Sequence, residues 1–314
     1  PSRSSGVPAS IAPLPIEAPM LSRDSWMLWL FLAPTLALMG AFLYWPLVGT
    51  VWESFHATSF ISPEPRFVGL EVYERVLSGR EFPEILRNSI VWTLGAVLLQ
   101  NVLGFFVALL LNQGLPGQGL LRALVLLPFV LPGVVTAILW RFMYDPQLGL
   151  INSLMLRTGL AEGGTAWLAS SDTAMAAVIF VAVWKGFPFS MLIYLAALQS
   201  VDRAQLEAAT IDGAGPWRRL VDVTLPAIRH VIVVNVVLTL ILTFNYFDIV
   251  WVMTRGGPQN ATHIFPTQIF ETGFGQFRFG EAAVYGVVSI LVIAALVALY
   301  VIATRAGGER RRTS

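Results

Sequence analysis

Few side chains in this sequence are of the kinds that catalyse reactions or bind metals. The sequence has no cysteine, which excludes disulfides, thiol nucleophiles and cysteine-based zinc sites. Its three histidines, His56, His230 and His263, are far apart in sequence and do not predict a metal site. With no nucleophile–base pair or metal cluster visible, the sequence does not predict an enzyme, and we expect no cofactor on this chain.

The single lysine, Lys185, is the charged group with the most unusual position. It lies in a long apolar stretch beside Gly186 and Pro188, where a helix could be locally opened. Because a lysine at the centre of a spanning helix costs roughly 2.5–3.5 kcal/mol, we expect it to line a pathway, to extend to the membrane surface or to pair with a carboxylate such as Asp248. Four uncharged polar residues also interrupt apolar stretches and are candidates to face a cavity or a partner helix: Gln100, Asn101, Asn235 and Asn245.

The elements that would position these residues are membrane helices. Of the 314 residues, 56% are hydrophobic and only 12% are charged, against roughly 25% charged residues in soluble domains. The net charge of +1 and the lack of a basic stripe argue against nucleic-acid binding. Since Lys185 is the only lysine and no Gly-x-x-x-x-Gly-Lys-Ser/Thr pattern occurs, a P-loop is excluded, and ATP would have to bind another chain.

Six stretches are long and apolar enough to cross a bilayer, which takes roughly 20 residues in a helix. They lie at about 26–48, 89–111, 120–143, 174–198, 228–253 and 282–304. The expected fold is therefore an all-α polytopic membrane protein with six transmembrane helices. Pro128 and Pro132 favour a kink in the third stretch, which could belong to a gate or be a static bend.

An even number of spans places both termini on one side of the membrane. The run Arg310–Arg312 follows the last span directly, and an excess of arginine marks the cytoplasmic side. We therefore expect a disordered cytoplasmic tail at 1–24, a transmembrane domain at 25–304 and a basic cytoplasmic tail at 305–314. The inner connections are then 112–119 and 199–227, and the outer ones are 52–87, 144–173 and 254–281.

The longer inner connection, residues 200–227, reads as two short helices joined by a tight bend. Asp202 can cap a helix over 204–211, Gly213 and Gly215 can end it, and Pro216 can begin the next. Its small residues, Ala208, Ala209 and Ala214, would let another protein approach closely. The residues alone also allow an amphipathic helix at the membrane surface that has no partner.

The same loop closely resembles the EAA loop of bacterial ABC importer permeases. The resemblance rests on Glu207-Ala208-Ala209, then Gly213 after three residues, then Leu225-Pro226 at the matching distance, with Asp212 and Ala214 also agreeing. Further stretches resemble the carbohydrate-uptake subgroup, of the maltose and sn-glycerol-phosphate type. These stretches are 145–152, 184–189 with 195–199, and 244–248 with 254–258. The resemblance covers about 26–304.

The resemblance implies a permease (MetI-like) fold and a set of partners. The EAA loop would dock as a coupling helix in a groove of an ATP-binding subunit dimer, with Glu207 as a charged anchor. ATP and Mg²⁺ would bind that partner and not this chain. A second permease subunit and an extracytoplasmic solute-binding protein would complete an importer in the plasma membrane of a bacterium, surrounded by membrane lipid.

The resemblance also implies where a sugar substrate would pass. Sugar contacts in related maltose-type permeases correspond here to Ala182, Lys185, Gly186, Phe189, Ile241, Phe244 and Asn245, and Asp248 adds a carboxylate nearby. Phe189 and Phe244 could stack on sugar rings, and Asn245 could bind hydroxyls. A glycerol-phosphate-type polyol ester is the alternative substrate, because Lys185 suits an anion. A secondary transporter is the alternative of another class, although no internal repeat is evident and Asp248 is its only candidate coupling carboxylate.

Overall fold

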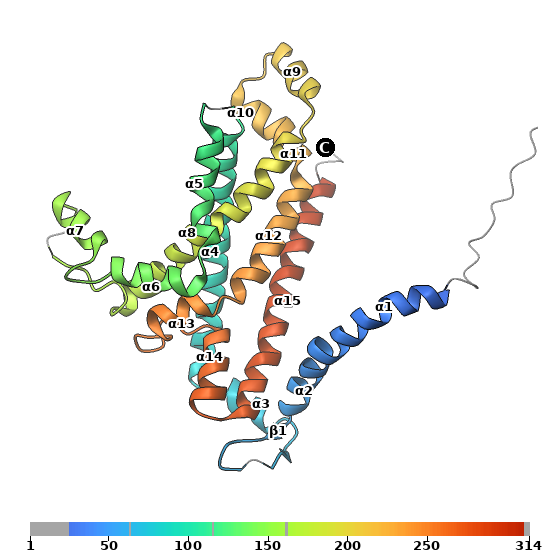
Figure 1. Cartoon of the computed structure of the whole chain (residues 1–314), viewed down its shortest axis with the longest axis vertical. Helices are drawn as coiled ribbons and strands as arrows, with labels where there is room; N and C mark the ends of the chain where they lie inside the picture. Colours follow the sequence, from blue (N-terminus) through green and yellow to red (C-terminus); the bar gives the residue numbers. More distant parts are fainter. Residues whose placement is uncertain (1–24, 63, 115, 161–162, 311–314) are drawn as a thin grey trace, which may run out of the picture. The chain divides into compact units, whose positions relative to one another are not determined.

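The computed structural model describes residues 25–62, 64–114, 116–160 and 163–310 (Figure 1). The expected disordered tail at 1–24 lies outside the described residues, as do residues 311–314 of the basic tail. The chain divides into two units, residues 1–49 and residues 50–314.

The first unit is helical wherever it is described. It contains α1 (Ser25–Met39), a π-helical turn η1 (Gly40–Tyr44) and most of α2 (Trp45–Glu53). Residues 29–53 form a helix that is long and apolar enough to cross a membrane. The first expected span, 26–48, is therefore confirmed, and its helix runs five residues further, to Glu53.

Five long helices carry the second unit (Figure 1): α4 (Glu81–Leu111), α5 (Gln118–Val130), α8 (Ser171–Gln199), α12 (Arg229–Phe244) and α15 (Phe279–Arg310). Shorter helices connect them: α3 (Glu71–Leu77), α6 (Gly133–Met143), α7 (Leu150–Arg157), α9 (Arg203–Ile211), α10 (Pro216–Arg218), α11 (Leu225–Ala227), α13 (Asp248–Thr254) and α14 (Phe265–Phe270). Two π-helical turns, η2 (Arg219–Thr224) and η3 (Glu271–Gly275), complete the helical part. One small antiparallel pair, β1 (His56–Ala57) with β2 (Arg66–Phe67), departs from the all-α expectation.

Two of the six expected spans are bent, not continuous. The third consists of α5 and α6, which meet at an angle of 95°. Pro132 has no N–H to donate and keeps Leu131 extended, with ψ at 135°, so the helix breaks instead of merely kinking. The fifth was expected over 228–253, but α12 ends at Phe244, and residues 248–253 belong to the separate helix α13. At the other end of α12, the helical segment 216–227 meets it at a bend of 70°.

The two ends of the second unit differ in what they carry (Figure 1). The α9 end holds α9, the connection between α4 and α5 and the last turns of α15. The opposite end, here called the α14 end, holds α3, β1, α14 and the first turns of α4 and α15. Both connections that the sequence assigns to one side, 112–119 and 199–227, thus lie at the same end.

The centre of the second unit is the contact between α4 and α8. Gly104 makes it close, because a Cβ at this position would lie 2.7 Å from the Ser190 Cβ and 2.9 Å from the Met191 backbone nitrogen. Small residues allow this kind of approach between membrane helices. The contact fixes α8, which continues into the loop that carries α9.

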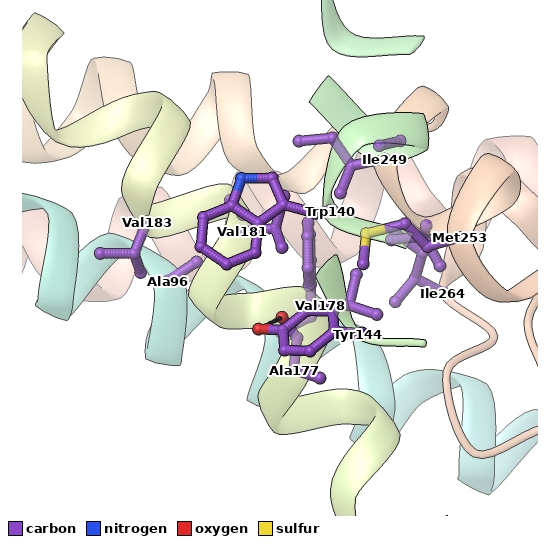
Figure 2. Close-up of a cluster of buried hydrophobic side chains, with 14 residues drawn as sticks. Ala96, Trp140, Tyr144, Ala177, Val178, Val181, Val183, Ile249, Met253 and Ile264 are labelled. Atoms are coloured by element: carbon purple, nitrogen blue, oxygen red, sulfur yellow. Dashed lines mark hydrogen bonds between the residues drawn. The ribbon is translucent and has the colours of Figure 1, made fainter. Parts of the chain in front are cut away.

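A second cluster of buried side chains fastens α6 and α13 to α8 (Figure 2). Trp140 of α6 and Tyr144, which directly follows α6, pack in one cluster with Ile249 and Met253 of α13 and with Val178 of α8. The ring centroids of Trp140 and Tyr144 are 5.6 Å apart. The broken segment α6 is therefore held by α13, the helix that begins with Asp248.

Candidate functional site

The loop of residues 200–227 forms the predicted helical hairpin. The Asp202 carboxylate accepts a hydrogen bond from the Ala204 N–H at 2.9 Å and caps α9. Gly213 follows the helix with φ at +79°, and the Ala214 N–H donates to the Ala209 carbonyl at 2.9 Å. Pro216 opens α10 at its first position. The helix cap, the bend and the start of the second helix all lie at the residues predicted from the sequence.

The hairpin projects at the α9 end and exposes most of its outer surface (Figure 1). Glu207, Ala208, Asp212 and Gly213 are exposed, whereas Ala209 and Ala214 are half-buried at the bend. Leu225 is half-buried and Pro226 exposed in α11, where the chain turns into α12. The eight residues of the loop motif therefore differ in how far they are exposed.

Two large apolar side chains at the hairpin were missed by the sequence reasoning. Ile211 is 86% exposed and Trp217 is 73% exposed, on either side of the bend at Gly213. The Arg219 guanidinium donates to the Thr210 hydroxyl at 3.0 Å and ties the two arms together. Within residues 200–227 these are the two large apolar side chains that the protein leaves exposed. Their signal in the sequence was an apolar residue on each side of the glycines.

The break between α5 and α6 brings together two charged residues of the predicted pathway. The Lys185 ammonium donates a hydrogen bond to the Leu131 carbonyl, the last residue before Pro132. The Asp248 carboxylate lies against Gly133, where any Cβ would overlap it. The Lys185 cation lies at the partially negative C-terminal end of α5, and the Asp248 carboxylate lies at the partially positive N-terminal end of α6, so both charges are favoured by the helix dipoles. Within the described chain the two side chains form no direct ion pair.

The remaining predicted pathway residues are not all accessible in this conformation. Phe189 is half-buried and stacks on Phe129 of α5 with ring centroids 5.9 Å apart, and Asn245 is exposed at the end of α12. Gly186 is buried, and a Cβ there would lie 2.6 Å from the Gln100 amide nitrogen. Phe244 is 3% exposed and packs against Phe265. Gly186 and Phe244 are thus covered by protein in this state.

Three polar candidates inside spans bond to neighbouring helices. The Gln100 amide donates to the Ala182 carbonyl at 3.1 Å. The Asn101 amide donates to Thr239 at 2.9 Å and its oxygen accepts from Asn235 at 2.8 Å. All three are buried between α4, α8 and α12. Of the two roles left open for them, contact with a partner helix is the one observed.

The stretch 145–152 is structural in this conformation. Asn152, 2% exposed, donates to the Thr165 carbonyl at 2.9 Å and accepts from the Trp167 indole at 3.0 Å. Backbone N–H groups of Leu148 and Gln147 lower the pKa of the Asp145 carboxyl below its ordinary value. These bonds organise the connection between α6 and α8. In the parts of the chain that the structure describes, no group of three or more His, Asp or Glu could hold a metal ion.

Comparison with known proteins agrees with this arrangement. The family described as binding-protein-dependent transport system inner membrane component matches residues 100–310. A trehalose/maltose transport system permease protein, MalF, of Thermococcus litoralis is 35% identical, over 92% of this chain and 96% of the relative. The sn-glycerol-3-phosphate transport system permease protein UgpA of Yersinia pestis is 31% identical, over 87% of this chain and 92% of the relative.

A solved structure has the same fold. A chain of a bacterial ABC transporter involved in the import of the acidic polysaccharide alginate has a TM-score of 0.79, with 23% identity, over 91% of this chain and 97% of that one. The fold, with up to six spans when each bent pair counts as one, is thus that of an ABC importer permease, and these relatives are transport proteins, not enzymes. The chain belongs to the family of inner-membrane components of binding-protein-dependent transport systems.

Proposed function

We propose that this chain is the permease subunit of an ATP-driven importer for carbohydrates, a disaccharide or oligosaccharide, and that residues 200–227 couple it to an ATP-binding subunit. The observation that carries the coupling role is the exposed hairpin, whose capped helix presents Glu207 and whose bend is flanked by Ile211 and Trp217. An apolar side chain on each side of a rigid turn suits a groove in a partner, with Glu207 as a charged anchor.

The chain's connectivity supplies a mechanical path from this hairpin to the substrate. α8 leads into α9, and α11 leads directly into α12, so a push on the hairpin is delivered to two helices. α8 carries Lys185 at the break between α5 and α6, and α12 is followed by α13 with Asp248. ATP-driven closure of the partner would make the contacts at this break differ between the inward-facing and outward-facing states. Coupling requires such a difference.

The remaining parts of the importer follow from this assignment. ATP and Mg²⁺ bind a dimer of separate ATP-binding subunits, since this chain has no P-loop, and the chain itself holds no cofactor. A second permease subunit forms the other half of the pathway, and a solute-binding protein delivers the solute. The α9 end and both termini face the cytoplasm, which agrees with the arginine bias of the sequence.

The substrate pathway runs past the break between α5 and α6. Lys185, Phe189, Asn245 and Asp248 are the residues through which the chain contacts solute. Gly186 and Phe244 join them only if the helices rearrange, because both are covered here. A glycerol-phosphate-type ester is the second candidate substrate, favoured by the ammonium of Lys185 and by the similarity to the glycerol-3-phosphate permease.

Reconstituted transport tests the coupling role. The chain, assembled with its partner subunits in proteoliposomes, is assayed for solute taken up per ATP hydrolysed. We expect Glu207→Ala to lower this ratio at least severalfold, whereas Gln205→Ala, another exposed position of α9, leaves it unchanged. Equal ratios for both variants would remove the hairpin from the coupling mechanism.

Competition for uptake tests the substrate class. Unlabelled maltose, trehalose and sn-glycerol 3-phosphate are each added to the wild-type transporter with labelled maltose or trehalose. We expect the two sugars to compete and the phosphate ester to have no effect. Uptake of sn-glycerol 3-phosphate without sugar uptake would show that the substrate is the phosphate ester and not a carbohydrate.

A further inference from the structure

A polar cavity of about 320 Å³ lies at the α14 end, among α4, α13, α14 and η3. Its volume is at the lower end of the range for ligand-sized cavities. Two of its lining side chains are more than nine-tenths buried, His263 at 7% and Gln268 at 5% exposure. Trp251, Asn260 and Glu271 line it as half-buried residues. Neither Lys185 nor Asp248 belongs to it.

The loop at one side of this cavity is fixed by hydrogen bonds. The buried Asn88 amide donates to the Asn260 carbonyl at 2.9 Å, and the hydroxyls of Thr254 and Thr262 share a bond of 2.7 Å. Arg255, Gln259 and Asn260 have positive φ angles of 51°, 50° and 63°. Three left-handed residues that are not glycine in one loop are unusual, and such strain persists only where the surroundings enforce it.

Several polar groups of the cavity have no partner within the described chain. The side chains of Arg255, Asn260 and Glu271 form neither a hydrogen bond nor an ion pair there. The His263 ring bonds Thr267 through Nδ1 only, which leaves Nε2 unused. Guanidinium and amide donors thus stand beside carboxylate and amide acceptors. A ligand that satisfies these donors and acceptors together must carry groups that can both donate and accept hydrogen bonds, as hydroxyls can.

The charge of the cavity disfavours anions. Glu81 and Glu271 oppose the single guanidinium of Arg255. Burial lowers the pKa of His263, and the nearby charges of Glu271 and Glu81 only partly oppose this effect, so its imidazole is neutral at pH 7. A phosphate or uronate group would meet two carboxylates and one cation. A neutral, hydroxyl-rich ligand meets no such penalty.

We propose that this cavity is a binding site for a neutral saccharide at the outer face of the transporter, separate from the pathway at the α5–α6 break. The ligand class rests on the proposed function, whereas the site itself rests on the cavity. The Trp251 ring stacks on Phe247 at 5.6 Å and meets Phe270 edge-on at 4.8 Å, and the part of it that lines the cavity would contact one sugar ring. The free amide of Asn260 and the carboxylate of Glu271 would bind hydroxyls. Trp251 and Asp248 are both in α13, so the same short helix connects the outer site to the pathway.

Hydrogen–deuterium exchange locates the binding directly. The assembled transporter in lipid nanodiscs is measured with and without millimolar maltose, trehalose or sn-glycerol 3-phosphate. We expect one of the sugars to slow exchange in residues 255–276 and the phosphate ester to leave it unchanged. Protection by the phosphate ester alone, or protection by sugar confined to other segments, would overturn the proposal.

Three variants decide whether the named side chains form the site. Asn260→Gly removes the amide and keeps the left-handed backbone, and Glu271→Gln removes only the charge; we expect each to weaken the sugar-dependent protection about three- to tenfold. Gln259→Gly, the matched control, changes the adjacent left-handed residue outside the cavity and retains wild-type protection. Protection equal to wild type in both site variants refutes the outer site, while sugar competition in the uptake assay still supports the proposed function. Failure of sugars in uptake, with protection retained, refutes the function and keeps the site.

Discussion

The two glycines of the coupling hairpin allow backbone strain to be separated from side-chain bulk. An added Cβ at Gly213 or at Gly215 would meet no other atom within 4 Å. Only Gly213 has a positive φ, at +79°. Replacing Gly213 by alanine therefore costs about 1–2 kcal/mol of backbone energy, whereas the same change at Gly215, with φ at −67°, is nearly neutral.

The expected consequence is a local opening of the hairpin. A cost of about 1–2 kcal/mol corresponds to a factor of roughly 5–30 in the population of the open form. We expect Gly213→Ala to speed amide exchange in residues 203–218 by about that factor and to lower the solute transported per ATP hydrolysed. Gly213→Asn should lie between alanine and wild type, because asparagine tolerates the left-handed region.

The comparison with Gly215→Ala is decisive. Thermal unfolding of the whole assembly should be similar for both alanine variants, because the hairpin can open locally and relieve the strain while the helix bundle stays folded. If Gly215→Ala lowered the transport ratio as much as Gly213→Ala, or if Gly213→Ala behaved as wild type in both assays, the strain argument would be refuted.

Three further outcomes test other parts of the molecule. Gly104→Ala should overpack the α4–α8 contact and lower stability by about 1–3 kcal/mol. Gly95→Ala should not, because the nearest neighbour of its added Cβ is the tip of the Ile179 side chain at 3.4 Å. Denaturation in nanodiscs measures the stability of both variants. Lys185→Met leaves the Leu131 carbonyl without its donor, so its melting temperature should fall while Lys185→Arg preserves it; no fall would contradict this. Because burial lowers the pKa of His263, the unfolded chain binds the proton more readily, and stability should fall as pH drops below about 6.5; a melting temperature that falls equally in His263→Gln would show that another group is responsible.

The coupling hairpin could be predicted from sequence because its signals are local. Asp202 caps the helix two residues on, Gly213 takes a conformation that other residues avoid, and Pro216 can begin a helix but not continue one. Each of these effects acts over a few residues. None depends on what the distant chain does.

The substrate pathway was harder to predict because apolar stretches do not reveal which face of a helix meets which neighbour. Gln100 and Asn101 resemble pathway residues in the sequence, yet both bond to neighbouring helices. Phe244 was predicted to face sugar, whereas Phe265, twenty-one residues later in the sequence, covers it here. The outer cavity had no sequence signal, since α4, α13 and α14 contribute to it from separate stretches.

The break between α5 and α6 also bears on how the protein fits its bilayer. α5 has 13 residues, which rise about 20 Å along its axis, whereas the hydrocarbon layer is about 30 Å thick. α5 alone is therefore too short to cross this layer, and the peptide groups where it breaks must be wetted or enclosed by protein, as the Leu131 carbonyl is by the Lys185 ammonium. Any movement that pulls α8 away from this break must therefore replace the Lys185 ammonium with another donor, such as water, and solvent access would then set how readily this part of the transporter moves.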